Sequence, residues 1–207
     1  MDLFKTLIVI LLSSVLVNNY VLSRFLGICP FLGVSKKLDQ ASGMGISVTA
    51  VMLLATAATW PIYKFILSPD WAVGTGRDLG YLQTIVFILI IAILVQLLEN
   101  ILKKYIPTLY KSLGVYLPLI TTNCTILGVT ILNLDNGYNF IESIVCAAGA
   151  GIGFLVAMVL FSGVRRRVEE ANVPKCFDGL PITLVAAAMV SLSFMGFGGI
   201  VEAIFGA

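Results

Sequence analysis

The sequence contains no histidine and few charged residues, and both shortages narrow the class of protein. Histidine is the commonest general base and metal ligand, so its absence argues against a soluble enzyme. Charged residues make up 12% of the 207 positions, against about 25% in soluble domains. No glycine-rich phosphate loop follows a strand-like segment, and the stretch GAGIG at 149–153 lies inside a long apolar run. We therefore expect any nucleotide to bind elsewhere.

Apolar residues are abundant and arranged in long runs. They make up 59% of the chain, and the mean hydropathy is +1.03. A bilayer core about 30 Å thick takes about 20 apolar residues per helix. Six charge-free runs of suitable length occupy residues 6–23, 40–63, 79–98, 112–134, 143–164 and 179–201. The sequence predicts an all-α integral membrane protein with six transmembrane helices in one membrane domain, 1–207, and the first helix is expected to be retained.

The basic residues are distributed unevenly between the connections. Cationic loops near membrane segments stay in the cytoplasm, which predicts that both termini lie outside. The stretch VRRRVEE at 164–170 is interpreted as a topology anchor, and no nucleic-acid partner is expected. The connections after runs one, three and five hold Lys36, Lys37, Lys103, Lys104, Lys111, Arg165, Arg166, Arg167 and Lys175, against Lys5, Lys64 and Arg77 on the other side.

Two cysteine-containing stretches, FLGICPFLGVSKK at 25–37 and LGVYLPLITTNCTILGV at 113–129, resemble each other. An offset of 95 residues superposes CPFLGV on CTILGV with four identities in six positions. The same offset relates the later runs approximately, so the chain divides into repeats at about 1–105 and 106–207. Each repeat holds three crossings, and an odd number forces the second repeat to enter from the opposite face. This pattern predicts a 3+3 inverted-topology repeat.

Helix-breaking residues cluster in these two stretches, at Gly27, Pro30 and Gly33 in the first and at Gly114 and Pro118 in the second. We therefore predict that helices 1 and 4 are broken near the middle of the membrane. Broken helices are tolerated there only where protein or a cavity satisfies the backbone. Paired breaks in two halves point to a site between them.

Cys29 and Cys124 come at these matched breaks. Three interpretations are open for them: small packing residues, a disulfide, which the reducing cytoplasm disfavours, or thiolate ligands of a soft metal or an iron-sulfur cluster. A cluster needs four ligands, usually all cysteine, so a partner chain or a second copy would have to supply two. Cys146 and Cys176 have no counterpart at the same offset and are interpreted as a packing residue and a loop residue.

The stretches LVNNYVLSRFLGICPFLGVS and YLPLITTNCTILGV closely resemble the A-type membrane subunits (RnfA) of the Rnf electron-transport complexes, and the resemblance runs from residue 3 to about 205. The chain is more distantly similar to the E-type subunits of the sodium-translocating NADH:quinone oxidoreductases. The resemblance implies a multi-pass protein in the bacterial cytoplasmic (inner) membrane. The complex would be a translocase that couples electron transfer between ferredoxin and NAD+ to movement of Na+ or H+. Flavins and other iron-sulfur clusters would lie in other subunits.

The resemblance also implies a cofactor and partners. One intramembrane [2Fe-2S] cluster would be shared with the homologous six-helix E-type subunit, and the remaining partners would be the B-, C-, D- and G-type Rnf subunits and membrane lipid. Cys29 and Cys124 would then be this chain's two iron ligands. Candidate backbone hydrogen-bond donors around such a cluster are the amides of Gly27, Ile28, Asn123 and Thr125.

Glu99 is a candidate for an ion path because charged residues in membrane runs are costly and often functional. It lies at the end of the third run, and a helical pair with Lys103 explains it equally well. The sequence is compatible with either Na+ or H+. Two other functions remain open: a secondary transporter using the same broken helices, and a purely structural membrane subunit. Both predict that serine can replace the two matched cysteines.

Overall fold

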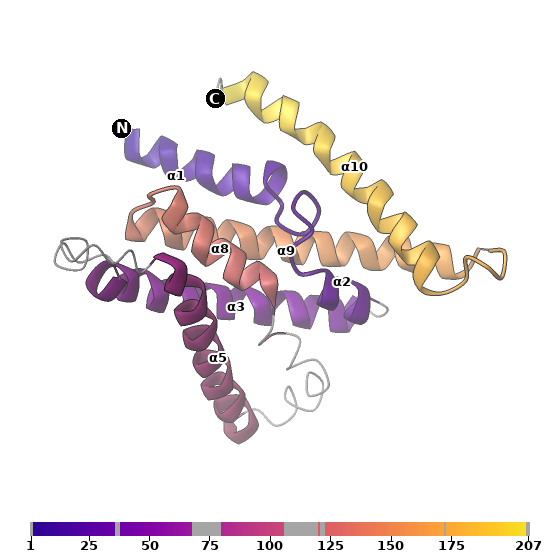
Figure 1. Cartoon of the computed structure of the whole chain (residues 1–207). Helices are drawn as coiled ribbons and strands as arrows, with labels where there is room; N and C mark the ends of the chain where they lie inside the picture. Colours follow the sequence, from indigo (N-terminus) through magenta and orange to yellow (C-terminus); the bar gives the residue numbers. More distant parts are fainter. Residues whose placement is uncertain are drawn as a thin grey trace.

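The computed structural model describes residues 2–35, 38–67, 80–105, 120, 123–171 and 173–205, and within these ranges it contains helices and no strand (Figure 1). The all-helical prediction is therefore confirmed for this part of the chain. The helices are α1 (Asp2–Leu12) with the π-helical turn η1 (Ser13–Val17), α2 (Ile28–Val34), α3 (Leu38–Ile62) with the π-helical turn η2 (Tyr63–Leu67), α5 (Gly80–Tyr105), α8 (Cys124–Asp135), α9 (Phe140–Glu169) and α10 (Leu180–Phe205).

Helices α3 and α9 pack against each other in opposite directions and form the centre of the molecule (Figure 1). Small residues allow the close approach. A Cβ on Gly151 would lie 2.5 Å from Thr49 Cγ2, and a Cβ on Gly45 would lie 3.1 Å from the Cα of Leu155. Residues Leu38–Phe65 and Phe140–Glu169 are each long and apolar enough to cross a membrane. Six crossings remain a prediction, since the other apolar helical segments among the described residues are shorter.

The chain leaves the helical path between η1 and α2, and a buried asparagine organises this segment. Asn19 is 1% exposed. Its Oδ1 accepts hydrogen bonds from the amides of Val21 and Leu22, at 3.1 and 3.3 Å. Its Nδ2 donates to the carbonyl oxygen of Gly153 in α9, at 2.9 Å. One amide side chain thus pairs backbone groups that the interrupted helix leaves without partners, as a buried irregular segment requires.

The interruption lies upstream of the glycine and proline cluster. Pro30 and Gly33 are inside α2, and Gly27 is its N-cap. Proline is tolerated at Pro30 because the first four amides of a helix have no intrahelical partner. The matching break expected around Gly114 and Pro118 lies outside the described residues.

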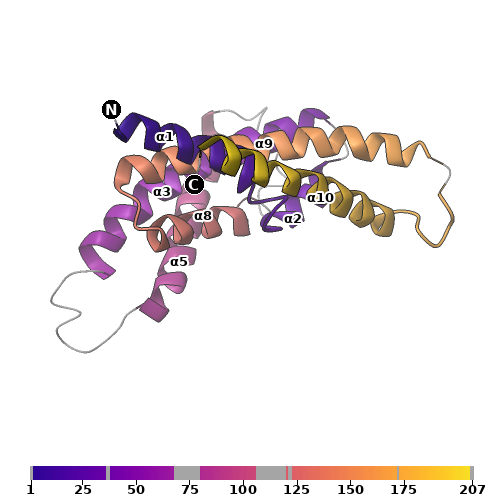
Figure 2. The ribbon, with the colours of Figure 1, turned by 90° about the horizontal axis from the view of Figure 1, so that it is seen from above.

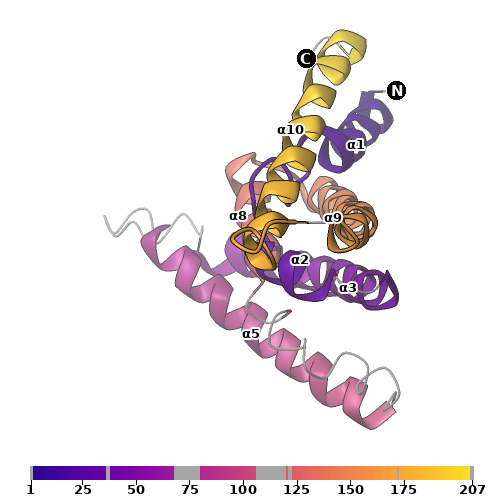
Figure 3. The ribbon, with the colours of Figure 1, turned by 90° about the vertical axis from the view of Figure 1, so that its right-hand side faces the viewer.

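The remaining helices surround the central pair. Helix α1 and the turn η1 pack on α9, α10 packs on η1 and α9, and α5 packs on α3. The N-terminal end of α1 and the C-terminal end of α10 lie at the same end of the molecule as the turn between α8 and α9, and the α9–α10 connection lies at the opposite end (Figures 1 and 2). The C-terminal end of α5 lies away from the other helices (Figure 3).

Candidate metal centre

The two matched cysteines lie in the first turns of two helices that meet. Cys29 is the second residue of α2, and Cys124 is the first residue of α8. The amide of Gly27 donates a hydrogen bond to Cys124 Sγ at 2.9 Å. Because Gly27 precedes Cys29 by only two residues, this contact joins two parts of the chain that carry cysteines 95 positions apart. Both thiols are exposed on the surface of the chain, and neither is in a disulfide.

Glycine is the only residue type that fits at position 27. The φ of Gly27 is +79°, and a Cβ added to it would lie 2.2 Å from Thr125 Oγ1 and 3.1 Å from Asn123 Oδ1. A side chain would therefore collide with Thr125, press on Asn123 and also strain the backbone. The backbone around Gly27 rests directly on the first turn of α8.

Asn123 and Thr125 flank Cys124 in the buried start of α8. Asn123 is the N-cap, and its Oδ1 accepts a hydrogen bond from the backbone amide of Thr125 at 3.0 Å. The backbone amide of Asn123 donates to the Ile120 carbonyl at 3.2 Å. Of the four candidate backbone donors, Gly27 is the one that donates a hydrogen bond to a cysteine sulfur, that of Cys124. Within the part of the chain that the structure describes, Asn123 Nδ2 and Thr125 Oγ1 are buried without a hydrogen-bond partner.

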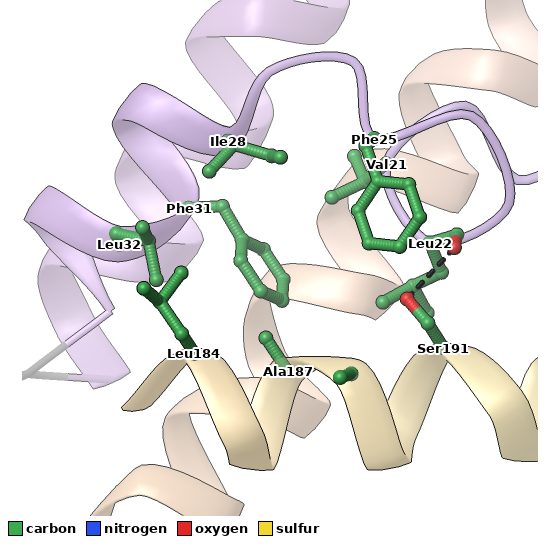
Figure 4. A pocket seen from close by; sticks show the side chains of 10 residues that line it. Val21, Leu22, Phe25, Ile28, Phe31, Leu32, Leu184, Ala187 and Ser191 are labelled. Carbon is green, nitrogen blue, oxygen red and sulfur yellow. Dashed lines mark hydrogen bonds between the residues drawn. The ribbon is translucent and has the colours of Figure 1, made fainter. Parts of the chain in front are cut away.

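An apolar cavity of about 70 Å³ lies between α2, the segment before it and α10 (Figure 4). Ser191 Oγ in α10 donates to the Leu22 carbonyl at 2.7 Å and ties α10 to this segment. The side chain of Ile28 points into the cavity. The lining residues are Val21, Leu22, Phe25, Ile28, Phe31, Leu32, Leu184, Ala187, Ala188 and Ser191. This flank of α2 is therefore apolar.

Two further cysteines lie apart from the pair. Cys146 in α9 is 2% exposed, and its Sγ lies 3.4 Å from Ser14 Oγ and 3.6 Å from the hydroxyl oxygen of Tyr20. These contacts agree with its interpretation as a packing residue. Cys176 is exposed in the connection between α9 and α10. Among the described residues, no three cysteine, aspartate or glutamate side chains gather closely enough to hold a metal ion.

Glu99 is not part of the cysteine pair. It is half-buried in the C-terminal half of α5. An ion path through Glu99 stays a prediction.

Asn19 supports the segment that leads to Gly27 through its hydrogen bonds to Val21 and Leu22. The dipeptide Asn18-Asn19, two amide side chains inside an apolar run, is the sequence signal for such a residue. Sequence reasoning missed Arg165, which the charge pattern groups with its neighbours as a topology anchor but which is 7% exposed. Nothing in VRRRVEE distinguishes Arg165 from the next two arginines.

Comparison with known proteins agrees with the resemblance that the cysteine segments carry. The chain matches the family "Rnf-Nqr subunit, membrane protein" over residues 7–201. It is 57% identical to the A-type subunit of the Na+-translocating ferredoxin:NAD+ oxidoreductase complex of Acetobacterium woodii, over 94% of this chain and 97% of the relative. It is 52% identical to the A-type subunit of the ion-translocating oxidoreductase complex of Syntrophotalea carbinolica, over 95% and 98% of the two chains. For the protein of the same name from Serratia proteamaculans the identity is 50%, over 94% and 97%. This chain, whose two cysteine segments meet at Gly27, belongs to the Rnf-Nqr family of membrane subunits.

Proposed function

We propose that this chain is the A-type membrane subunit of an ion-translocating ferredoxin:NAD+ oxidoreductase and takes part in its electron relay. In this proposal Cys29 and Cys124 provide two thiolate ligands for an intramembrane [2Fe-2S] cluster, and a homologous E-type subunit provides the other two. The observation that carries the proposal is the hydrogen bond from the Gly27 amide to Cys124 Sγ, 2.9 Å long, which brings the two cysteine segments together. The names of the relatives support the reaction of the whole complex.

The residues present fit such a group. Thiolates are the ligands of iron-sulfur clusters, and four are usual. This chain offers two, on segments that the Gly27 contact joins, and both are exposed and so accessible to a partner chain. A bound cluster would accept and release one electron at a time. Hydrogen bonds to the sulfurs tune a cluster's potential, and the Gly27 amide already donates to one sulfur.

The start of α8 places backbone amides beside one of the two sulfurs. Cys124 is the first residue of this 12-residue helix, and the unpaired amides of a helix N-terminus carry partial positive charge. The apolar cavity lined by Ile28 and Phe31 on the other side of α2 keeps polar groups away from that flank. The chain's own part is therefore to hold two sulfurs, one of them beside backbone amides, next to an apolar flank of α2.

Several contacts support the inverted repeat that this proposal requires. The repeat pairs α2 with α8, α3 with α9 and α5 with α10, whose first residues are 96, 102 and 100 positions apart. Helix α3 contacts α5 as α9 contacts α10, and α5 contacts α8 as α10 lines the cavity beside α2. The antiparallel central pair α3 and α9 would then lie across the pseudo-two-fold axis. We propose six crossings with both termini on the outer face of the bacterial inner membrane.

The rest of the proposed complex follows from the reaction named for the relatives. NAD+ and ferredoxin would bind other subunits, which would also hold the flavins and further iron-sulfur clusters, and the B-, C-, D- and G-type subunits would complete the assembly. The ion is Na+ or H+, and the name of the Acetobacterium woodii relative favours Na+. Glu99, half-buried in α5, is the candidate for an ion path in this chain.

Electron paramagnetic resonance on the purified complex tests the proposal. Cys29→Ser and Cys124→Ser are expected to abolish one [2Fe-2S] signal while the complex still assembles. Cys146→Ser and Cys176→Ser, at the packing and loop positions, should leave every signal intact. If all four variants kept the signals and electron transfer of the unaltered complex, the cluster assignment would be wrong, and a transporter or structural role would replace it.

A further inference from the structure

We infer that Arg165 is a positioning residue that holds α2, and with it Cys29, in place. This inference rests on the proposed cluster site, because positioning matters to electron transfer only if Cys29 is a ligand. Arg165 forms a run of three arginines with Arg166 and Arg167 at the end of α9, and the proposed role applies to Arg165 alone.

Arg165 makes three hydrogen bonds from a nearly buried position. It is 7% exposed. Its Nη1 donates to the carbonyl oxygen of Leu32 and to Ser35 Oγ, the latter at 2.9 Å. Its Nε donates to Glu169 Oε1 at 3.2 Å. A buried guanidinium is stable only when its charge and donors are paired, and two of its three partners belong to α2 and its C-cap.

These partners lie where α2 needs them. Leu32 is in the last turn of the helix, and Ser35 is the residue that caps it. The last four carbonyls of a helix have no intrahelical partner, and a cation at the C-terminus is also favoured by the helix dipole. Arg165 therefore donates to a carbonyl in the last turn of α2, where intrahelical partners run out.

Helix α2 depends on such contacts because it is only seven residues long. Helices shorter than about 12 residues are marginal on their own and are held by tertiary packing. A second contact to α9 comes from Phe31, whose ring stacks on that of Phe161 with centroids 4.1 Å apart. Cys29 precedes Leu32 by three residues, less than one turn. Movement of the C-terminal end of α2 would therefore move Cys29.

The neighbouring arginine offers a matched control. The side chain of Arg166 is 83% exposed, and its Nε lies 3.6 Å from Glu170 Oε1. Replacing either arginine by glutamine removes one positive charge from the same connection. A role in membrane topology would be weakened equally by both variants, whereas positioning of α2 would be lost only with Arg165.

The test compares the complexes carrying Arg165→Gln, Arg165→Lys and Arg166→Gln. Loss of a residue that supports a metal ligand lowers metal affinity by about 10–100-fold, so Arg165→Gln should lose the [2Fe-2S] signal about tenfold faster in the presence of an iron chelator. Its g-values and midpoint potential should shift as well. Arg165→Lys should be intermediate, because an ammonium group restores the charge but not the planar fork. Arg166→Gln should match the unaltered complex.

A second readout does not depend on iron. With the other three cysteines replaced by serine, the rate at which maleimide modifies Cys29 in the complex should change with Arg165→Gln and stay constant with Arg166→Gln. Equal behaviour of the Gln variants in both measurements would overturn the inference. A complex that lacks the [2Fe-2S] signal before any substitution would instead overturn the proposed function, and the maleimide rates would still decide whether Arg165 positions α2.

Discussion

At the scale of single residues, the position of the cysteine pair depends on a glycine that contacts it through the backbone. Gly27 combines a left-handed conformation with a neighbour in the space a Cβ would occupy, and its amide faces Cys124 Sγ. Any other residue would disturb this arrangement. The site is thus sensitive to a substitution that alters neither sulfur.

Replacing Gly27 by alanine should destabilise this contact strongly. The left-handed backbone costs about 1–2 kcal/mol for a residue with a Cβ, and overpacking against Thr125 adds about 1–3 kcal/mol. Gly137→Ala is the matched control, because Gly137 also has a positive φ, +66°, but nothing within 4 Å of its Cβ position. Thermal denaturation of the purified complex should show a larger loss for Gly27→Ala. Equal losses would mean that the contact with α8 contributes nothing.

Asn19 should matter far more than the asparagine beside it. Asn19→Ala removes the acceptor for the amides of Val21 and Leu22 and the side-chain donor to the Gly153 carbonyl of α9. Buried groups left unpaired cost about 1–3 kcal/mol each. Asn18 makes one side-chain hydrogen bond, to Ser13 Oγ at 3.1 Å, so Asn18→Ala should have a small effect. Comparable melting temperatures for the two variants would contradict this account of the segment.

Individual residues of the site differed in how well the sequence predicted them. Cys29 and Cys124 stood out because the same motif occurs twice. The Gly27 amide was predicted as a candidate hydrogen-bond donor because glycine interrupts helices and frees backbone groups. Arg165 was missed because burial of an arginine depends on which residues pack over it, and a run of charged residues does not indicate those contacts.

At the scale of helices, α9 is organised by small residues on two faces, one that meets α3 and one that meets η1. A Cβ on Gly149 would lie 3.0 Å from Ser14 Cβ, and a Cβ on Gly153 would lie 3.2 Å from the Ser14 carbonyl oxygen. The stretch GAGIG is therefore a packing surface, as small residues at membrane helix contacts are expected to be.

Gly151→Ala should loosen the pairing of α3 and α9. Its Cβ would lie 2.5 Å from Thr49 Cγ2, and overpacking of this kind costs about 1–3 kcal/mol. Gly163→Ala, in the same helix with nothing within 4 Å, should be neutral or slightly stabilising, because alanine favours helix over glycine by about 1 kcal/mol. Thermal stability of the detergent-solubilised complex distinguishes them. A stable Gly151→Ala variant would show that α3 and α9 have room to adjust.

The sequence predicted the helices better than their ends. Long charge-free runs located the helical segments, because hydrophobic length is a strong signal. The interruption was predicted around Gly27, Pro30 and Gly33. The non-helical segment runs from the end of η1 at Val17 to Gly27, and Pro30 and Gly33 lie inside α2. A proline in the first turn of a helix resembles a helix breaker in the sequence, and only the tertiary contacts of Asn19 reveal where the chain turns.

At the scale of the whole molecule, the arginine run of α9 and the two chain termini lie at opposite ends. The end of α9 with its three arginines and the α9–α10 connection lie opposite the end that holds both chain termini (Figure 1). Basic connections remain in the cytoplasm. This arrangement supports the proposed orientation.

Cys176 provides a test of that orientation. In a variant with the other cysteines replaced by serine, a membrane-impermeant maleimide should modify Cys176 in inverted vesicles and not in right-side-out ones. The opposite turn supplies the control, since Asn136 is exposed between α8 and α9. A variant with Asn136→Cys and Cys176→Ser should be modified only from outside. The reverse pattern would place the termini in the cytoplasm.

Iron content of the complete purified complex tests the central claim most directly. If Cys29 and Cys124 bind one shared [2Fe-2S] cluster, the variants Cys29→Ser and Cys124→Ser and the double variant should each lose about two iron atoms per complex. Separate sites would give losses that add in the double variant. Additive losses, or iron content equal to that of Cys176→Ser, would contradict the shared centre.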